Sequence, residues 1–311
     1  MRNEERFIMD TIRSVLPQLD ANDELLVYDD GSNDATVSIL ETVSSPVGNY
    51  KFFQMQQSGD GGVRNVNLAL SASRSEIIIF LGGHDLLEAG IIKKIKSDFS
   101  NYPKAGLWSG RCELIDEGGT TRLHRSPVMA TSLNFIGPDS CEFELVRGEP
   151  WFAGFIAYRR ICLLEYQFDS YLGFLTDNFS SQLIAIKYGA LYSPEVSGAI
   201  RVMSGSFTDS TYNDLGRIEE IFVRLEDLAQ QPSIAKLCSQ NIKKIKLNVR
   251  IRHLKSKLQR FKPTKIRFFI QLLIYWATLF LFVMKTYKFR AVHIFYRRII
   301  LNYYLQYKRK N

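Results

Sequence analysis

Short apolar runs and amphipathic segments alternate along the first two thirds of the chain. The apolar runs have the length of buried strands, and the segments between them have the spacing of one-sided helices. The predicted strands are 24–28, 51–55, 76–81 and 105–115, and the predicted helices are 4–16, 35–43, 63–71 and 86–99. The alternation from 24 to 112 predicts βαβ units, and therefore an α/β fold with a mainly parallel sheet flanked by helices.

The pattern changes twice further along the chain. A long polar segment, 116–150, has the character of a binding loop. It is followed by an apolar stretch at 151–158, helices at 159–166 and 179–188, and a strand at 190–202. From Asp214 onward the spacing is helical. We therefore expect a first domain at 1–212, with halves 1–112 and 113–212, and a helical extension at 213–311.

Charge separates these two parts. Residues 241–311 contain 19 Lys and Arg and no Asp or Glu, which leaves 21 basic against 32 acidic residues in 1–240. A basic amphipathic stripe from 234 onward suits an anionic membrane surface. An oligonucleotide could also bind it, but the 17 uncharged residues at 268–284 favour lipid.

The segment 268–284 is at the short limit of a membrane span, and both its flanks are basic. We expect a helix that lies in or dips into the bilayer surface, with a single span as an alternative. A buried helix hairpin in a homodimer interface remains open. The N-terminus lacks an apolar signal region, and the four Cys residues form no CxxC pair, so the expected location is cytoplasmic, on the inner face of the membrane.

Two adjacent carboxylates, Asp29 and Asp30, end the first predicted strand. In open α/β sheets, ligands bind outside the carboxyl ends of the strands, so this acidic corner faces the expected crevice. The following residues, Gly31 to Asp34, favour a turn and a helix start. Capping of that helix explains one of the two acids and leaves the other for a ligand.

Three further positions carry candidate chemistry. Arg64 and Asn65 start a helix after a glycine-rich loop and could hold a phosphate, although a solvated first turn is the alternative. His84 and Asp85 follow another strand and could bind a divalent ion, or form a simple pair. Asp177 precedes a predicted helix and by itself indicates an N-cap.

With these residues in place, the sequence resembles family 2 glycosyltransferases of the GT-A fold. The resemblance covers about residues 3–205. It is carried by Asn3 to Gln18, by YDDGSNDAT at 28–36, by Gly61 to Asn65, and by FLGGHDLLEAG at 80–90.

The resemblance implies a donor site for a nucleotide sugar, with UDP-sugars preferred. Asp29 and Asp30 would contact the base and ribose, and Arg64 and Asn65 would support the nucleotide or its diphosphate. Ser32 and Gly83 belong to the same implied site. The family's metal motif departs here, because Gly82 and His84 stand where the family has acids, which leaves His84 and Asp85 to bind Mn²⁺ or Mg²⁺.

The implied reaction is inverting transfer, with Asp177 as the base that activates the acceptor hydroxyl. Trp151, Gly154 and Arg201 are the candidate acceptor contacts, and the acceptor would be a saccharide or a lipid-linked saccharide in cell-surface polysaccharide synthesis. The family's first strand has no counterpart before Asn3, so a catalytically impaired nucleotide-sugar-binding homologue is the main alternative.

Overall fold

The computed structural model describes residues 1–44, 49–125, 133–147, 155–203 and 211–259. The chain forms two compact units, Met1–Ile242 and Lys243–Asn311. The sequence placed this boundary at residue 212, whereas the structure includes a further 30 residues in the first unit. The physical reason is tertiary packing, since Arg224 donates to the Asp169 carboxylate at 2.7 Å and ties the following helix to the domain.

The helices are α1 (Ile8–Val15), α2 (Thr36–Glu41), α3 (Val63–Ala72), α4 (Ile91–Asn101), α5 (Pro138–Arg147), α6 (Arg160–Glu165), α7 (Thr176–Tyr188), α9 (Leu215–Leu228) and α10 (Ala235–Gln259), with short 3₁₀ turns η1 (Leu16–Gln18) and η2 (Ser170–Leu175). The strands are β1 (Leu25–Asp30), β2 (Tyr50–Met55), β3 (Ile77–Ile79), β4 (Leu86–Leu87), β5 (Leu107–Ile115), β6 (Thr121–Arg125), β7 (Asn134–Ile136), β8 (Ile156–Arg159) and β9 (Ala190–Arg201).

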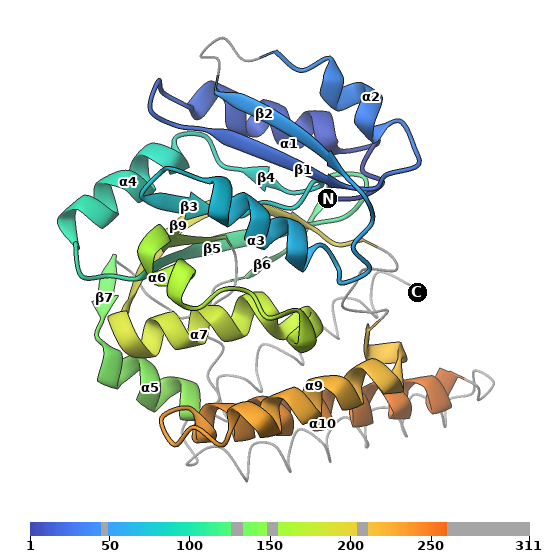
Figure 1. The fold of residues 1–311 in the computed structure, drawn as a ribbon, viewed down its shortest axis with the longest axis vertical. Coiled ribbons are helices and arrows are strands. Elements are labelled where there is room, and N and C mark those ends of the chain that lie inside the picture. Colours follow the sequence, from blue (N-terminus) through green and yellow to red (C-terminus); the bar gives the residue numbers. More distant parts are fainter. Residues whose placement is uncertain (45–48, 126–132, 148–154, 204–210, 260–311) are drawn as a thin grey trace, which may run out of the picture. The chain divides into compact units, whose positions relative to one another are not determined.

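The strands form two sheets (Figure 1). The parallel pair β1 and β2 makes the smaller sheet, and the larger one has the order β3-β8-β5-β9-β4, with β6 on β5 and β7 on β9. Its longest pairing, between β5 and β9, is parallel. Because β1 and β2 run in the same direction, Asp30 lies in register with Met55, and the loops that leave both strands start at one edge.

Helices pack on these sheets, and two clusters of buried apolar side chains lie between them. α1 and α2 pack on β1 through a cluster that includes Ile8, Val27 and Leu40. α4 packs on β5 and β8 around the fully buried Trp108, whose indole donates to Asp98 at 2.8 Å. These clusters fix the strand ends, and therefore the loops that carry the candidate site.

Two predicted helices have different starting points. Residues 86–87 belong to a short strand that pairs with Ala199 and Gly198 of β9, and α4 begins only at Ile91, after Gly90 at φ 80°. In contrast, α7 begins at Thr176 and not at Phe179, so Asp177 lies in the first helical turn and is not the N-cap.

None of the helices within the described ranges combines the length and the apolarity needed to cross a membrane. The predicted membrane segment 268–284 lies outside those ranges.

Candidate active site

Asp29 organises the turn that follows β1. Its Oδ2 accepts hydrogen bonds from the backbone N–H groups of Gly31 at 3.1 Å and Ser32 at 2.9 Å, and its Oδ1 accepts from the Ser32 hydroxyl. Asp29 is fully buried. It therefore fixes the loop by the local side-chain bonding that aspartate favours after a strand.

Asp30 connects this loop to two others. Its Oδ1 accepts from the Ser58 backbone N–H at 3.0 Å and from the Asn65 side-chain amide at 2.7 Å. Asp30 is 6% exposed and Asn65 is 3% exposed. One carboxylate oxygen thus joins the end of β1, the loop after β2 and the start of α3, which are the three segments predicted to surround the donor.

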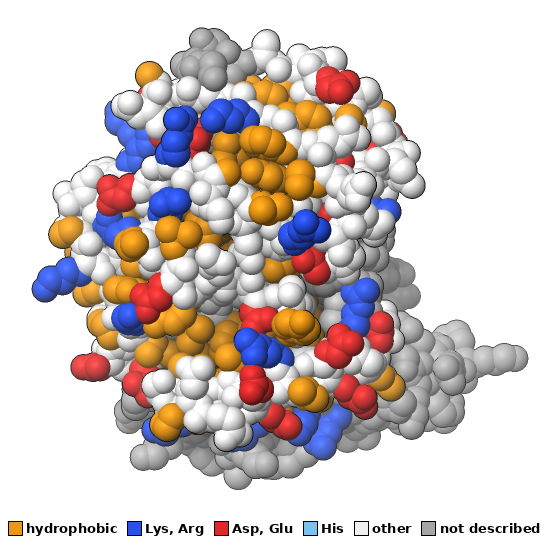
Figure 2. All heavy atoms as spheres, in the orientation of Figure 1, with side chains coloured by type: hydrophobic (Ala, Val, Ile, Leu, Met, Phe, Trp, Pro, Cys, Tyr) orange, Lys and Arg blue, Asp and Glu red, His pale blue; other side chains and the backbone are white. Residues whose placement is uncertain are grey.

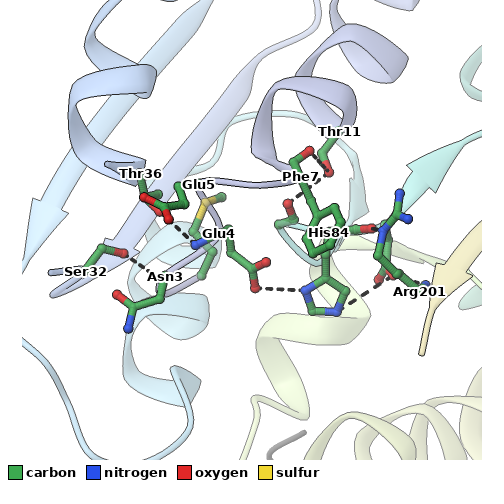
Figure 3. Close-up of polar contacts among 12 residues, drawn as sticks. Asn3, Glu4, Glu5, Phe7, Thr11, Ser32, Thr36, His84 and Arg201 are labelled. Carbon is green, nitrogen blue, oxygen red and sulfur yellow. Dashed lines mark hydrogen bonds and ion pairs between the residues drawn. The ribbon is translucent and has the colours of Figure 1, made fainter. Parts of the chain in front are cut away.

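The N-terminal segment bridges the turn that follows β1 and the loop that follows β3 (Figure 3). On one side, Asn3 donates its backbone N–H to the Ser32 hydroxyl at 2.8 Å, and Glu4 donates its own to the Thr36 hydroxyl at 2.7 Å. On the other side, the Thr11 hydroxyl donates to the Gly83 carbonyl at 3.0 Å. The loops that hold Asp29 and His84 are therefore braced by the same short stretch of chain.

His84 lies between two carboxylates. Its Nδ1 is 2.8 Å from Glu4 Oε1, and its Nε2 is 4.0 Å from Asp85 Oδ1. Burial disfavours the charged ring, but the hydrogen bond to Glu4 and the charges of Asp85 and Glu4 outweigh it and raise the pKa of His84. Burial also raises the pKa of Asp85, which is 13% exposed.

These residues fit a divalent ion only with help from a ligand. Among the described residues, no group of three or more His, Cys, Asp and Glu side chains is arranged to hold a metal. Gly82 supplies no side chain, but the space where its Cβ would lie is 2.7 Å from Asp85 Oδ2 and 3.7 Å from His84 Nε2. Two atoms that could ligate an ion thus lie near one position beside Gly82, and an ion there would also need oxygens from a diphosphate.

Arg201, at the end of β9, donates hydrogen bonds to the backbone of neighbouring loops. It is 6% exposed, and its guanidinium donates to the His84 carbonyl at 3.0 Å and to the Asp116 carbonyl at 3.0 Å. Its backbone N–H donates to Asp85 Oδ1 at 2.9 Å, and its guanidinium lies 4.4 Å from the centre of the Phe7 ring. Arg201 was predicted to contact the acceptor. That role stays a prediction, and in the structure the Arg201 side chain contacts the loops after β3 and β5.

Asp177 is exposed in the first turn of α7. Protein atoms nevertheless crowd around its carboxyl group, and this desolvation raises its pKa, although the Asn178 N–H donates to Oδ1 at 2.6 Å and opposes the rise. The N-cap residue of α7, Leu175, makes no side-chain cap. A carboxylate of raised pKa that remains accessible is a better proton acceptor than an ordinary aspartate.

A chain of side-chain amides supports this helix start. Gln182 donates to the Asn178 side-chain oxygen at 2.7 Å, and Asn241 of α10 donates to the Gln182 side-chain oxygen at 3.0 Å. Gln182 and Asn241 are each 3% exposed. The amide chain therefore links the turn that carries Asp177 to the first residues of α10, which the sequence had assigned to a separate extension.

The structure places some of the predicted site residues in contact and leaves others apart. Asp30 and Asn65 are in contact, and His84 lies next to Asp85, whereas the Arg64 side chain is exposed beside them. Trp151 and Gly154 lie outside the described residues. Sequence reasoning missed Glu4, because no spacing signal joins it to a histidine 80 positions away.

A family model described as "Glycosyl transferase family 2" matches residues 1–158. The chain is also similar to two curated proteins of Bacillus subtilis (strain 168). The putative glycosyltransferase EpsH is 31% identical over 118 residues, which are 38% of this chain and 34% of EpsH. The minor teichoic acid biosynthesis protein GgaA is 31% identical over 101 residues, which are 31% of this chain and 23% of GgaA. The chain thus spans about a third or less of either relative.

Two solved structures are similar in fold. S. aureus TarS 1–349 in complex with UDP-GlcNAc aligns with a TM-score of 0.59 at 15% identity, over 78% of this chain and 71% of that one. The mannosyltransferase PcManGT of Pyrobaculum calidifontis, in complex with GDP-Man and Mn²⁺, aligns with a TM-score of 0.55 at 17% identity, over 90% of this chain and 78% of that one. These likenesses confirm the predicted α/β architecture of the GT-A type.

Proposed function

The chain belongs to glycosyl transferase family 2, and on this premise we propose that it transfers a sugar, with inversion, from a nucleoside diphosphate sugar to a hydroxyl of a saccharide or lipid-linked acceptor. The proposed process is the synthesis of a cell-surface polysaccharide. EpsH and GgaA support this proposal, since one is named a putative glycosyltransferase and the other a minor teichoic acid biosynthesis protein.

The observation that carries the proposal is that one carboxylate oxygen of Asp30 accepts two hydrogen bonds from different segments. Its Oδ1 holds Ser58 and Asn65 at the carboxyl edge of β1 and β2, where ligands bind in sheets of this class. Buried carboxylates that tie three loops together at such an edge preorganise a site for a polar ligand. Asp29, Ser32 and Gly83 complete the proposed donor site, and Arg64 supplies a cation at the start of α3.

UDP-sugars are the preferred donor class in this proposal. Support comes from TarS, whose structure contains UDP-GlcNAc, while the GDP-Man of PcManGT makes a guanosine donor the alternative. In either case, the diphosphate requires positive charge as the leaving group departs. A divalent ion, Mn²⁺ or Mg²⁺, held by His84 and Asp85 would neutralise that charge.

Asp177 is the proposed base. In this step the acceptor oxygen forms a bond to the anomeric carbon, the bond from that carbon to the diphosphate oxygen breaks with its electrons, and the acceptor proton passes to the Asp177 carboxylate. The raised pKa of Asp177 favours this proton transfer over one to an ordinary aspartate. Trp151 and Gly154 remain proposed acceptor contacts, and Arg201 is proposed to act by holding the loop of His84.

The basic segment 234–311 is proposed to bring the enzyme to the anionic inner face of the membrane. Within the catalytic part, Lys and Arg side chains are interspersed with Asp and Glu on the face shown in Figure 2, so this face carries no large field of one sign. The excess of positive charge lies in residues 241–311. A lipid-linked acceptor at that membrane surface is consistent with this arrangement, and a homodimer formed through the same segment is the alternative.

The test is calorimetric titration of UDP, GDP and their sugar conjugates, with and without Mn²⁺, followed by assays for released nucleotide with saccharide and lipid-linked acceptors. We expect UDP to bind and Asp30→Ala to abolish binding. Absence of binding for every nucleotide would sink the proposed donor site.

A second candidate is a nucleotide-sugar-binding protein that lacks transferase activity. The observation that favours it is Gly82, which provides no carboxylate to the motif that resembles the family's metal site. Binding of a donor without release of nucleotide, across the acceptor panel and with Mn²⁺ present, would support this candidate and exclude the transferase.

A further inference from the structure

The loop that carries His84 begins with two glycines, Gly82 and Gly83, and a glutamate, Glu4, contacts the His84 ring. A side chain at Gly82 would place its Cβ 2.7 Å from Asp85 Oδ2 and 3.7 Å from His84 Nε2. The other oxygen of that carboxylate, Oδ1, already accepts from the Arg201 backbone N–H at 2.9 Å. The absence of a side chain at residue 82 therefore spares Asp85 Oδ2 a close contact at a position that also lies 3.7 Å from His84 Nε2.

Glu4 determines which nitrogen of His84 borders that space. Glu4 Oε1 lies 2.8 Å from Nδ1, and a carboxylate accepts a proton, so Nδ1 is the nitrogen that carries hydrogen and Nε2 is the one left to face a ligand. In metal sites, a histidine that ligates through one nitrogen almost always donates its other N–H to a carboxylate, a carbonyl or water. The pair has this arrangement.

Glu4 is itself held in place. Its side chain is 12% exposed, and its backbone N–H donates to the Thr36 hydroxyl at 2.7 Å (Figure 3). A Cβ at Gly83 would lie 2.9 Å from Glu4 Cγ, so only glycine leaves room for the glutamate to reach the ring without a shift. The contact thus depends on Glu4 and on the absence of a side chain at Gly83.

We propose that Glu4 is a positioning residue for a two-ligand divalent-ion site, formed by His84 Nε2 and Asp85 Oδ2 at the space beside Gly82, and completed by oxygens of the donor diphosphate. This inference rests on the proposed donor site. The ion is of the Mn²⁺ or Mg²⁺ class, with Mn²⁺ preferred because imidazole suits it better than it suits Mg²⁺. Since only two protein atoms contribute, the ion binds appreciably only when the nucleotide is present.

A purely structural pair is the competing explanation. The contact between Glu4 and His84 would then only fasten the N-terminal segment to the loop after β3, as the hydrogen bond from Thr11 to Gly83 also does. The two explanations differ in one respect. A structural pair affects stability and nucleotide binding together, whereas a positioning residue affects ion affinity and leaves the nucleotide affinity measured without metal unchanged.

The experiment measures Mn²⁺ binding by electron paramagnetic resonance, with the full chain saturated by UDP, in the wild type, Glu4→Gln, Gly82→Ala and the control Glu5→Gln. We expect Glu4→Gln to weaken Mn²⁺ binding by about 10- to 100-fold, the usual loss when the partner of a ligating histidine is removed. Gly82→Ala should weaken it as well, because its methyl group must displace the Asp85 carboxylate. UDP affinity in EDTA should stay within about twofold in Glu4→Gln.

The control distinguishes the outcomes. Glu5 is the neighbouring acid and accepts from the Ala35 backbone N–H at 2.9 Å, so Glu5→Gln should retain wild-type Mn²⁺ affinity. Equal losses in Glu4→Gln and Glu5→Gln, or no loss in Glu4→Gln, would overturn the positioning role. UDP binding by the wild type without any Mn²⁺ binding would overturn the ion site and leave the donor site standing. Failure to bind UDP would overturn both.

Discussion

Removal of the Asp30 carboxylate tests the donor site most directly. In Asp30→Ala, the Ser58 N–H and the Asn65 amide both lose their acceptor, and Asn65 is only 3% exposed. A hydrogen bond to a charged group contributes about 1.5–3 kcal/mol, and a donor left buried without a partner costs about 1–3 kcal/mol. Relief of the repulsion from neighbouring Asp29 offsets part of this loss, so we expect a destabilisation of about 2–4 kcal/mol.

The assay is urea unfolding of the wild type, Asp30→Ala and Asp30→Asn, monitored by tryptophan fluorescence, to which the buried Trp108 contributes, together with titration of UDP. Asp30→Asn should lose about half as much stability, because an amide oxygen in the place of Oδ1 can still accept both bonds but without charge. Asp10→Asn, on the exposed face of α1, serves as the control and should change the stability by less than about 0.5 kcal/mol. The reasoning is refuted if Asp30→Ala unfolds like Asp10→Asn and still binds UDP.

Three other outcomes are expected. Asp177→Asn should reduce turnover by about 100- to 10,000-fold while sparing UDP affinity, and wild-type turnover by this variant would place the base elsewhere. Because the pKa of Asp177 is raised in the folded state, its ionisation at neutral pH disfavours folding, so Asp177→Asn should be at least as stable as the wild type at that pH. Wild-type turnover should fall with acidification through a pKa above the ordinary aspartate range, as measured by a pH–rate profile, and a limb at or below that range would contradict the assignment. The full chain should float with phosphatidylglycerol vesicles but not with phosphatidylcholine vesicles, and recovery in the soluble fraction with both would contradict membrane attachment through 234–311.

Local sequence signals were sufficient for the elements that approach the donor. The run of apolar residues before Asp29 predicted β1, and the glycine-rich loop before Val63 predicted the start of α3, because strand length and turn residues are local properties. Leu86 and Leu87 show the limit. Their strand exists only because they pair with Gly198 and Ala199, more than a hundred positions away, and no local pattern encodes that pairing.

The candidate site shows the same limit more strongly. Asp29 and Asp30 could be identified, since two acids at the end of an apolar run are unusual, but their separate tasks could not. In the structure, Asp29 accepts hydrogen bonds from the turn that follows it, and Asp30 accepts one from the Asn65 side chain. Likewise, Asp177 was predicted to be an N-cap because the apolar spacing of α7 becomes visible only at Phe179, whereas the backbone is helical from Thr176.

The contact between Glu4 and His84 also bears on whether the altered motif retains a function. A partly buried pair of this kind is weak evidence for stability, because well-packed apolar side chains of similar size would hold the segment about as well. The pair instead suits a role in directing the ring nitrogen on the far side, His84 Nε2, toward the position beside Gly82 that Asp85 Oδ2 also borders. On this argument, restoring the acid of the family motif by Gly82→Asp should not strengthen Mn²⁺ binding, because the new side chain would enter the space that the ion needs and repel Asp85. Stronger Mn²⁺ binding by Gly82→Asp in the presence of UDP would show instead that the glycine is a loss and not part of the site.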